Sequence, residues 1–482
     1  MVTEPNILIK IFLASILIAA LLPLVIYKHK SNFSYNIILL PIAACLVESI
    51  CITYFYIYSG RAQWKALEIG VVSLKFYLEP LGIIFFNLLI ILWLISALYS
   101  MYHMTKLESK NLARFLTFIG LTIFAAIFIA LSKNLFTMFI GYEMLTLFTI
   151  PLVAHNTFDK REVLVYIKTL IGTSIGLLLP FVIYVYYVSG TTEFILDGII
   201  PQNLNPLILH LLLFLAFFGT AKTAMLPFHN WITAAMIAPY PVSALLHAVA
   251  VVKAGIFCIL KIVIYIFGLK NLAILLQDFN WPLLAACFTL VFASYQAVRT
   301  SMVKHVLAYS TIANLALMMI AVFVLTPQSL MAAIAHMIGH SFTKITLFFS
   351  TGIFYTMTKS NYLKDLRGIG YKSPVTSIFF IIAALSMIGV PPLIGSATKD
   401  MIWEAMEAST YSYVLKISLV LYIMSVIYFM GKLTYLIFAK DGVLKERMPI
   451  SGMKIATAAS AIGTVSFPIL EKFMKSLLWA IL

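Results

Sequence analysis

Apolar residues dominate this chain in long runs, without the strict alternation that is typical of surface strands. Runs of about 18 or more apolar residues recur along the whole length, and each can cross about 30 Å of hydrocarbon. A hydropathy reading predicts about 14 transmembrane helices. The expected spans are residues 7–27, 36–58, 76–101, 112–131, 134–154, 163–188, 206–230, 240–266, 280–298, 305–326, 329–357, 374–398, 411–438 and 455–480. The pattern therefore predicts an all-α polytopic membrane protein.

The segments between these spans are short, which leaves no room for a soluble catalytic domain. Loops such as "KLESKNLAR", "DKRE" and "KSNYLKDLRGIGYK" are rich in Lys and Arg, and they fall on one side of the membrane if the N-terminus lies outside. The opposite side holds the acidic "SGTTEFILDG". Basic loops mark the cytoplasmic side, so we expect a multi-pass protein of the cell (inner) membrane with both termini outside. The first run is interpreted as a retained span and not as a signal peptide.

Two spans contain helix breakers. The seventh reads "FFGTAKTAMLPFHNW", with Pro227 five residues after Lys222, and the twelfth reads "SMIGVPPLIGSATKD", with two prolines before Lys399. Such breaks are tolerated only against protein or a water-filled cavity, and paired breaks indicate a transport site. The two broken spans are five spans apart, which suggests two repeats of five helices each. Because five is odd, the second repeat would be inverted relative to the first. The expected divisions are residues 1–111 (helices 1–3), 112–266 (first repeat), 267–440 (second repeat) and 441–482 (helix 14).

Composition agrees with a membrane protein, since 62% of the residues are hydrophobic and 11% are charged. No soluble domain could wet a surface with that balance. The formal net charge of +15 therefore indicates basic loops, and no nucleic-acid partner is expected. The four cysteines lie inside expected spans without metal-ligand spacing, so neither an iron–sulfur cluster nor structural zinc is indicated. We expect no cofactor.

Ionisable side chains inside spans are functional candidates, because each costs roughly 2.5–3.5 kcal/mol to insert. The membrane-embedded set is Glu143, Lys222, His247, Lys253, His336, His340, Lys344 and Lys399, with His229 near the end of the seventh span. A second group, nearer the span ends, could reach the interface and ranks lower: Lys168, Lys261, Lys304 and His305.

Glu143 and Lys222 are the natural pair in this set, since each favours the charged form of the other. The alternative is a static ion pair that only fixes two helices. Buried ion pairs are poor stabilisers, so such a pair needs another reason to persist.

The remaining lysines and histidines have the chemistry of a proton relay. Burial brings a lysine within reach of proton exchange near neutral pH, and histidine titrates there already. "HMIGHSFTK" places His336, His340 and Lys344 at i, i+4 and i+8, on one helical face. The alternatives are hydrogen-bonded core histidines, or a metal site that lacks a third ligand. Glu48 has no obvious partner beyond a Ser or Thr, and Glu79 is interpreted as helix-start chemistry.

Several segments resemble one family, the antiporter-like subunits shared by Mrp-type cation/proton antiporters, respiratory complex I and membrane-bound hydrogenases. The similar segments run from about residue 76 to 440 and include "NLFTMFIGYEMLTL", "GTAKTAMLPFHNWITAAMIAPYPVSALLHAVAVVKAG", "HMIGHSFTKITLFF" and "GVPPLIGSATKD". The resemblance implies 14 helices, two inverted repeats and a hydrated proton path near the midplane. It also implies that Glu143 and Lys222 couple neighbouring subunits, that Lys253 or Lys344 is central, and that Lys399 faces the exit.

Within this family, the chain resembles the D-type component of Mrp antiporters most, because it stops after helix 14 and carries lysine at position 399. The expected function is proton translocation in a multi-subunit Na⁺ or K⁺/proton antiporter, with other membrane subunits as partners. The alternative is a proton-pumping subunit of an NADH-quinone oxidoreductase or hydrogenase, which would carry an enzyme's name without its cofactor chemistry. A scaffold that has lost transport is disfavoured, because loss of function would release such costly charges.

Overall fold

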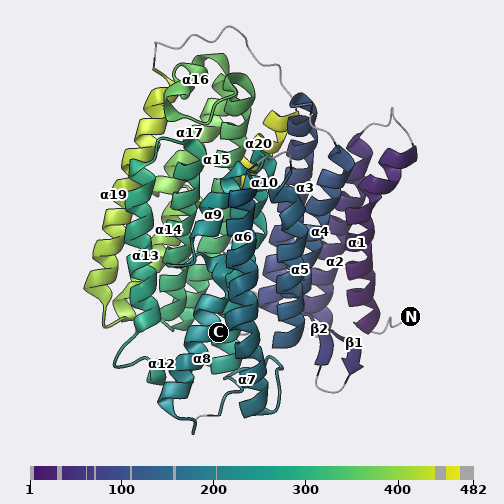
Figure 1. Ribbon diagram of the computed structural model, residues 1–482, viewed down its shortest axis with the longest axis vertical. Coiled ribbons are helices and arrows are strands. Elements are labelled where there is room, and N and C mark those ends of the chain that lie inside the picture. Colours follow the sequence, from purple (N-terminus) through teal and green to yellow (C-terminus); the bar gives the residue numbers. More distant parts are fainter. Residues whose placement is uncertain are drawn as a thin grey trace.

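A bundle of helices forms the protein in the computed structural model, which describes residues 5–29, 35–60, 62–69, 72–108, 111–155, 159–201, 203–439 and 452–466 (Figure 1). Ten helices of this described part are long and apolar enough to cross a membrane. The multi-pass helical fold is thus confirmed. The count of fourteen stays a prediction, and the last expected span, residues 455–480, lies partly outside the described residues.

Long apolar runs become continuous helices, because only internal hydrogen bonding satisfies the backbone in hydrocarbon. Their starts carry the expected signals. Asn134 caps α5 by accepting from the Thr137 amide, and Thr326 and Ser329 form a capping box at α15. The continuous helices are α1 (Pro5–His29), α2 (Leu39–Ser59), α3 (Pro80–Lys106), α4 (Leu112–Ala130), α5 (Leu135–Val153), α13 (Trp281–Arg299), α14 (Val303–Phe323), α15 (Pro327–Thr358), α19 (Ser412–Ile437) and α20 (Gly452–Gly463).

Four further spans are built from shorter pieces. Two contain π-helical turns: α6 (Lys160–Thr173), η2 (Ser174–Leu178) and α7 (Leu179–Ser189); then α10 (Tyr240–Ala244), η5 (Leu245–Val249), α11 (Val251–Lys261) and η6 (Ile262–Phe267). Two are broken as expected: α8 (Pro206–Gly219), η3 (Ala221–Thr223), α9 (Asn230–Ala234) and η4 (Ala235–Ile237); then α17 (Pro374–Ile388), α18 (Ile394–Ala405) and η8 (Met406–Ala408). The remaining short helices are η1 (Tyr35–Ile38), α12 (Leu269–Leu275), η7 (Leu363–Leu366) and α16 (Ile369–Lys372).

A β-hairpin accompanies the helices of the described residues. Strands β1 (Gln63–Ile69) and β2 (Val72–Tyr77) pair antiparallel, and they lie at the same end of the bundle as α12 (Figure 1). The hydropathy reading passed over this hairpin because it is too short to form a span. Phe76 of β2 also forms a bridge to Ser132 after α4. The hairpin therefore closes this end of the bundle over the α4–α5 turn.

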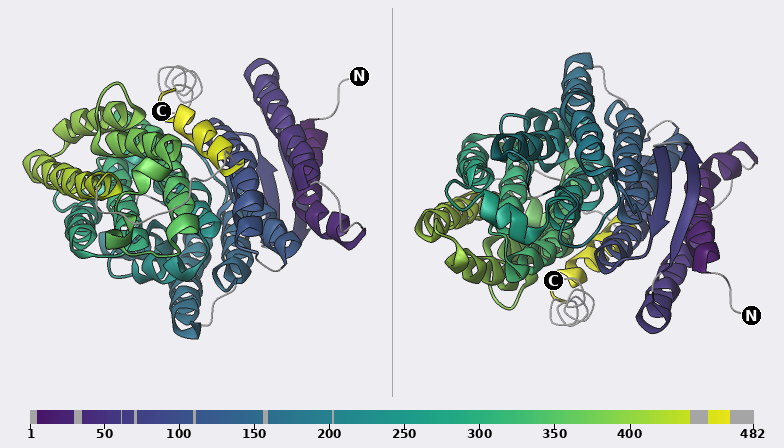
Figure 2. Two further views of the ribbon diagram at one scale, coloured as in Figure 1. Left: turned by 90° about the horizontal axis from the view of Figure 1, so that it is seen from above. Right: turned by 90° about the horizontal axis from the view of Figure 1, so that it is seen from below.

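Helix pairs at corresponding positions of the two halves pack together, in agreement with the expected repeats. The contacts of α4 with α5 match those of α13 with α14, and the contacts of α6 with α9 match those of α15 with α18. Helix α15 also contacts α3, α10, η5 and α20, so it connects the two halves. Seen end-on, the helices α1 and α2 form one flank, and α13 and α19 lie on the far side (Figure 2). The inverted relation of the repeats stays a prediction.

Candidate proton-transfer site

The break between α8 and α9 places Lys222 inside the protein. The helix ends at Gly219, and Ala224 takes a left-handed backbone conformation with a φ of 56°. Lys222 is fully buried, and its Nζ donates to the Tyr142 carbonyl at 2.9 Å and to Thr146 Oγ1 at 2.7 Å. The ammonium also lies 3.1 Å from the centroid of the Tyr142 ring. Helix α5 thus surrounds this lysine with neutral oxygens and an aromatic face.

The expected ion pair between Glu143 and Lys222 is not among the ion pairs of the described residues, which corrects the sequence interpretation. Lys222 donates instead to the Tyr142 carbonyl and the Thr146 hydroxyl of the same helix. Glu143 is half-buried, and its Oε1 has no hydrogen-bond partner within the described part of the chain. Its charge still acts on Lys222 through space.

Close backbone packing holds the broken segment against α11. A Cβ added at Gly255 would lie 2.6 Å from the carbonyl carbon of Lys222, so only glycine permits this approach. His229, near the end of the break, is almost buried, with Nδ1 3.3 Å from the Pro227 carbonyl and its ring against Phe292. These contacts of His229 do not include Lys222.

The two halves meet at Lys253 and His340. The Nζ of Lys253 on α11 lies 2.5 Å from Nδ1 of His340 on α15, and both side chains are buried. The carbonyl of His247 accepts a longer bond from the same Nζ at 3.5 Å. Both ring nitrogens of His247 lack partners among the described residues, as does Nε2 of His340. Buried imidazoles need partners, so these atoms identify positions that hydration would satisfy.

Helix α15 continues the line toward the second break. The rings of His340 and His336 are 6.2 Å apart, and His336 binds Thr398 Oγ1 at 2.9 Å and Asn314 Oδ1 at 3.0 Å. Thr398 directly precedes Lys399. The structure therefore brings Lys253, His340, His336 and the neighbour of Lys399 together, as a relay requires.

Lys344 and Lys399 are held in the same way as Lys222. Lys344 Nζ donates to the Leu307 carbonyl at 2.9 Å and to Ser310 Oγ. Lys399 Nζ donates to the carbonyls of Met387 and Ile388, which the second break frees from helical bonding. The histidine–lysine face expected in "HMIGHSFTK" is thus directed inward.

Two buried lysines were ranked too low from the sequence. Lys261 is fully buried and forms an ion pair of 2.6 Å with the fully buried Glu79, which corrects the interpretation of Glu79 as helix-start chemistry. Lys304 is also buried, and it donates to the carbonyls of Met236 and Ala238. Their nearness to span ends suggested snorkelling, and only tertiary packing shows otherwise. Lys168 is exposed, and Glu48 is bonded by Ser15 at 2.5 Å, as the simpler interpretations of both residues expected.

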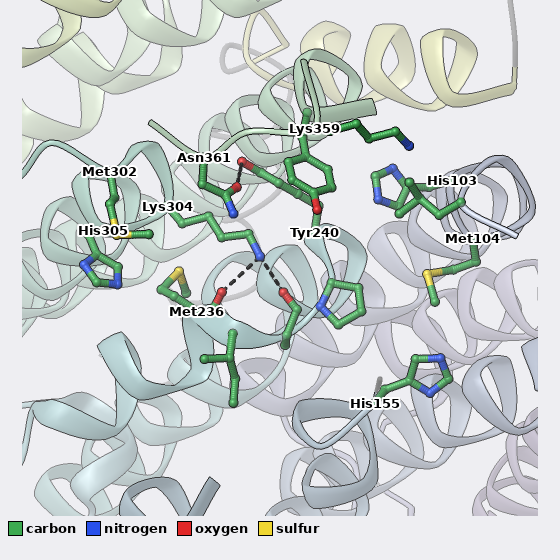
Figure 3. Close-up of a pocket in the computed structure, with 15 residues that line it drawn as sticks. His103, Met104, His155, Met236, Tyr240, Met302, Lys304, His305, Lys359 and Asn361 are labelled. Atoms are coloured by element: carbon green, nitrogen blue, oxygen red, sulfur yellow. Dashed lines mark hydrogen bonds between the residues drawn. The ribbon is translucent and has the colours of Figure 1, made fainter. Parts of the chain in front are cut away.

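A cavity of about 600 Å³ opens next to Lys304 (Figure 3). His103 of α3, Tyr240 of α10, His155 and Lys359 also line it. Lys304 points to the carbonyls at the end of η4, and Tyr240 donates to Asn361 at 2.9 Å (Figure 3). Burial and the nearby Arg114 lower the pKa of His155, which follows the end of α5. The hollow is lined by cations and neutral groups, without a carboxylate among its described lining residues.

Comparison with known proteins identifies the family to which the chain belongs. The model of the family described as NADH:quinone oxidoreductase/Mrp antiporter, TM, matches residues 132–425. The putative antiporter subunit mnhA2 of Staphylococcus saprophyticus is 28% identical over 371 residues, which are 73% of this chain and 45% of the relative. The probable K(+)/H(+) antiporter A/B subunit of Rhizobium meliloti is 28% identical over 369 residues, 73% of this chain and 35% of the relative. The chain thus spans about half, or less, of the length of these curated relatives.

Solved structures share the fold. A chain of the Mrp complex from Dietzia sp. DQ12-45-1b superposes with a TM-score of 0.83 at 22% identity, over 98% of this chain and 52% of that one. A chain of the membrane-bound sulfane sulfur reductase, an archaeal respiratory membrane complex, gives 0.83 at 20% identity, over 98% and 96%. At such identities the likeness concerns the fold. The greater resemblance to the D-type component of Mrp antiporters stays a prediction.

Proposed function

Because the chain belongs to the NADH:quinone oxidoreductase/Mrp antiporter transmembrane family, we propose that it is the proton-translocating subunit of a multi-subunit Na⁺ or K⁺/proton antiporter. The observation that carries the proposal is the contact between Lys253 and His340. It joins the charged groups of the first half to those of the second, so that a proton has a next group to reach at the boundary between the halves.

Neutral oxygens surround the lysines proposed as proton carriers, so the positive charge of each protonated lysine acts on the next one. Lys222, Lys344 and Lys399 are each held by backbone carbonyls or hydroxyls, so a protonated lysine carries a charge that no contacting carboxylate of the described residues compensates. Such charges repel one another strongly where the dielectric constant is low. The charge of Lys253 acts on Lys344, for example. A proton that arrives at one lysine therefore favours departure of the proton from the next.

Glu143 is assigned a separate role in this scheme. It is half-buried and does not contact Lys222, but its charge acts on that lysine through space. A cation brought near Glu143 by a neighbouring subunit would weaken this influence and disfavour the charged form of Lys222. Glu143 and Lys222 thus form the input of the line, His229, His247, His336 and His340 relay protons, and Lys399 forms the exit. Lys253 and Lys344 are the central carriers.

The remaining expectations complete the proposal. Other membrane subunits are the partners, protons and Na⁺ or K⁺ are the substrates, and the cell (inner) membrane is the location, with both termini on the outer side. Residues 112–266 and 267–440 act as the two inverted halves, between residues 1–111 and 441–482.

A second function is favoured by one observation. The chain and its structural neighbour from a respiratory membrane complex cover each other over 98% and 96% of their lengths. A proton-pumping subunit of a redox complex would use the same carriers with different partners. Identifying the proteins that copurify with the native complex separates the two functions, because flavin or iron–sulfur proteins would contradict the antiporter.

Transport itself is tested in inverted vesicles that contain the assembled complex. We expect added Na⁺ or K⁺ to dissipate an imposed pH gradient. Lys253→Ala should abolish this response while the complex still assembles. Normal transport by that variant would contradict the proposed line.

A further inference from the structure

The ion pair between Glu79 and Lys261 is unlike the environment of the other buried lysines. Glu79 directly precedes α3 and Lys261 ends α11, and both side chains are fully buried. Lys222, Lys304, Lys344 and Lys399 have only carbonyl or hydroxyl acceptors in the described part of the chain, whereas Lys261 contacts a carboxylate. This site therefore carries its own compensating negative charge.

Oxygen atoms surround the Lys261 ammonium as they would surround an alkali cation. Its Nζ lies 2.6 Å from Glu79 Oε1, it donates to the Ser132 carbonyl, and it lies 3.4 Å from Ser132 Oγ. The ring of Phe194 covers it, with the centroid at 4.4 Å. Hard cations prefer carboxylate, carbonyl and hydroxyl oxygens, and carbonyls can replace the hydration shell of such an ion.

The second carboxylate oxygen gives an independent indication. Glu79 Oε2 is buried and lies outside the 2.6 Å contact between Oε1 and Lys261. A buried carboxylate oxygen without a partner costs more than a neutral one. A cation that contacts both carboxylate oxygens would satisfy Oε2 as well.

A surface hollow is lined in part by the sequence neighbours of two residues that contact Lys261. A pocket of about 270 Å³ is lined by Lys75, Lys133, Glu193 and residues of the β-hairpin. Lys133 follows Ser132, and Glu193 precedes Phe194, so two residues that line the hollow are next in sequence to two that contact Lys261.

We propose that the Glu79–Lys261 pair is an exchange site, at which Na⁺ or K⁺ replaces the Lys261 ammonium between the Glu79 carboxylate and the oxygens of Ser132. This inference rests on the proposed antiport function and deepens it. An N–H bond of Lys261 breaks, the proton leaves to solvent water, and the metal ion forms contacts with the freed oxygens. The net charge of the site is the same before and after the step, because one cation enters for each proton that leaves.

Proton release from the purified complex, measured with a pH-indicating dye in weak buffer, tests this exchange without any transport assay. NaCl or KCl should release protons from the unmodified complex, whereas choline chloride should not. Lys261→Arg retains an ion pair but holds its proton at all accessible pH, so the release should fall by about tenfold. Glu79→Gln, of the same shape, should lose both the proton release and the binding of radioactive ²²Na⁺.

Lys416→Arg is the matched control, because Lys416 of α19 pairs with Glu407 at 2.9 Å, is partly exposed and does not line this hollow. It should release protons as the unmodified complex does. The proposal is overturned if salt releases no protons from the unmodified complex. It is also overturned if Glu79→Gln and Lys261→Arg release as many protons as the unmodified complex does. A failure of the relay shows instead in Lys253→Ala vesicles, so the two proposals fail separately.

Discussion

The Nζ of Lys253 lies 2.5 Å from Nδ1 of His340, and this contact joins the two halves of the molecule. A lysine nitrogen and an imidazole nitrogen at this distance share a proton, because two donors would repel each other. The pair can therefore hold one excess charge but not two at once. This is the property that a single-file carrier needs at the boundary between two half-channels.

Replacing His340 by Gln should break this connection. Glutamine can accept a hydrogen bond from Lys253 but does not titrate, so we expect cation-driven proton movement to fall by at least about tenfold. The assay is the pH gradient in inverted vesicles, with complex assembly checked by size-exclusion chromatography. His210→Gln is the control, since His210 lies on α8 away from the line. Full activity of His340→Gln would show that protons cross between the halves elsewhere.

Thr146→Val should weaken transport without abolishing it. The hydroxyl of Thr146 accepts from Lys222 at 2.7 Å, and its loss removes one of the two oxygens that hold the ammonium. A hydrogen bond to a charged group contributes about 1.5–3 kcal/mol, so we expect the transport rate to change by roughly tenfold or more. Thr117→Val is the isosteric control. If the two variants behave alike, the Thr146 contact has no role in transport.

Shortening the Glu143 side chain should reduce transport much less than removing its carboxylate or the Lys222 ammonium. Because the two residues do not form an ion pair, Glu143→Asp should retain most of the activity, whereas Glu143→Ala and Lys222→Ala should nearly abolish it while assembly survives. A through-space influence falls slowly with distance, and a contact ion pair does not tolerate shortening. Initial rates of cation-driven pH change measure this. Equal loss in Asp and Ala variants would indicate a contact that forms in the assembled complex.

Gly255→Ala should destabilise the broken helix. The new Cβ would lie 2.6 Å from the Lys222 carbonyl carbon, and such overpacking costs about 1–3 kcal/mol. We expect a lower melting temperature of the purified protein and a loss of transport. Gly172→Ala, where an added Cβ meets nothing within 4 Å, should change neither. An unchanged melting temperature for Gly255→Ala would mean that α11 can move away from the break.

The Glu193–Lys75 pair should make a small, acid-sensitive contribution to stability. The hydrogen bond from Lys75 lowers the pKa of the Glu193 carboxyl in the folded protein, so the pair stabilises the fold above the unfolded pKa of about 4.3. That contribution disappears as the pH falls through the lower, folded pKa. At pH 7 the unmodified protein should therefore have a higher melting temperature than Glu193→Gln. In strong acid the two melting temperatures should be equal. A difference that persists in acid would assign the effect to packing.

Hydropathy and helix breakers were sufficient to predict the bundle, the two interruptions and the inward face of His336, His340 and Lys344. These features depend only on the spacing of residues along the chain, which can be read directly from the sequence. The acceptors of Lys222 could not be predicted in this way, because the path of the broken segment past α5 decides that the ammonium reaches the Tyr142 carbonyl and the Thr146 hydroxyl. The pair of Glu79 and Lys261 joins residues far apart in sequence, and only the tertiary fold brings them together. The hairpin was missed because a hydropathy window is longer than its strands.

Helix α15 fixes the spacing of the titratable groups in the second half. Three of them stand four residues apart on one continuous helix, and a rise of 1.5 Å per residue separates successive groups by about 6 Å. The intervals are therefore set by the pitch of a single rod, independently of how the surrounding helices shift. A tilt of α15 would move all three groups together, and the distances that change would be those to their partners on other helices: Lys253, Thr398 and Ser310. The row of His336, His340 and Lys344 thus keeps its internal spacing, while its contacts with the neighbouring helices can open or close.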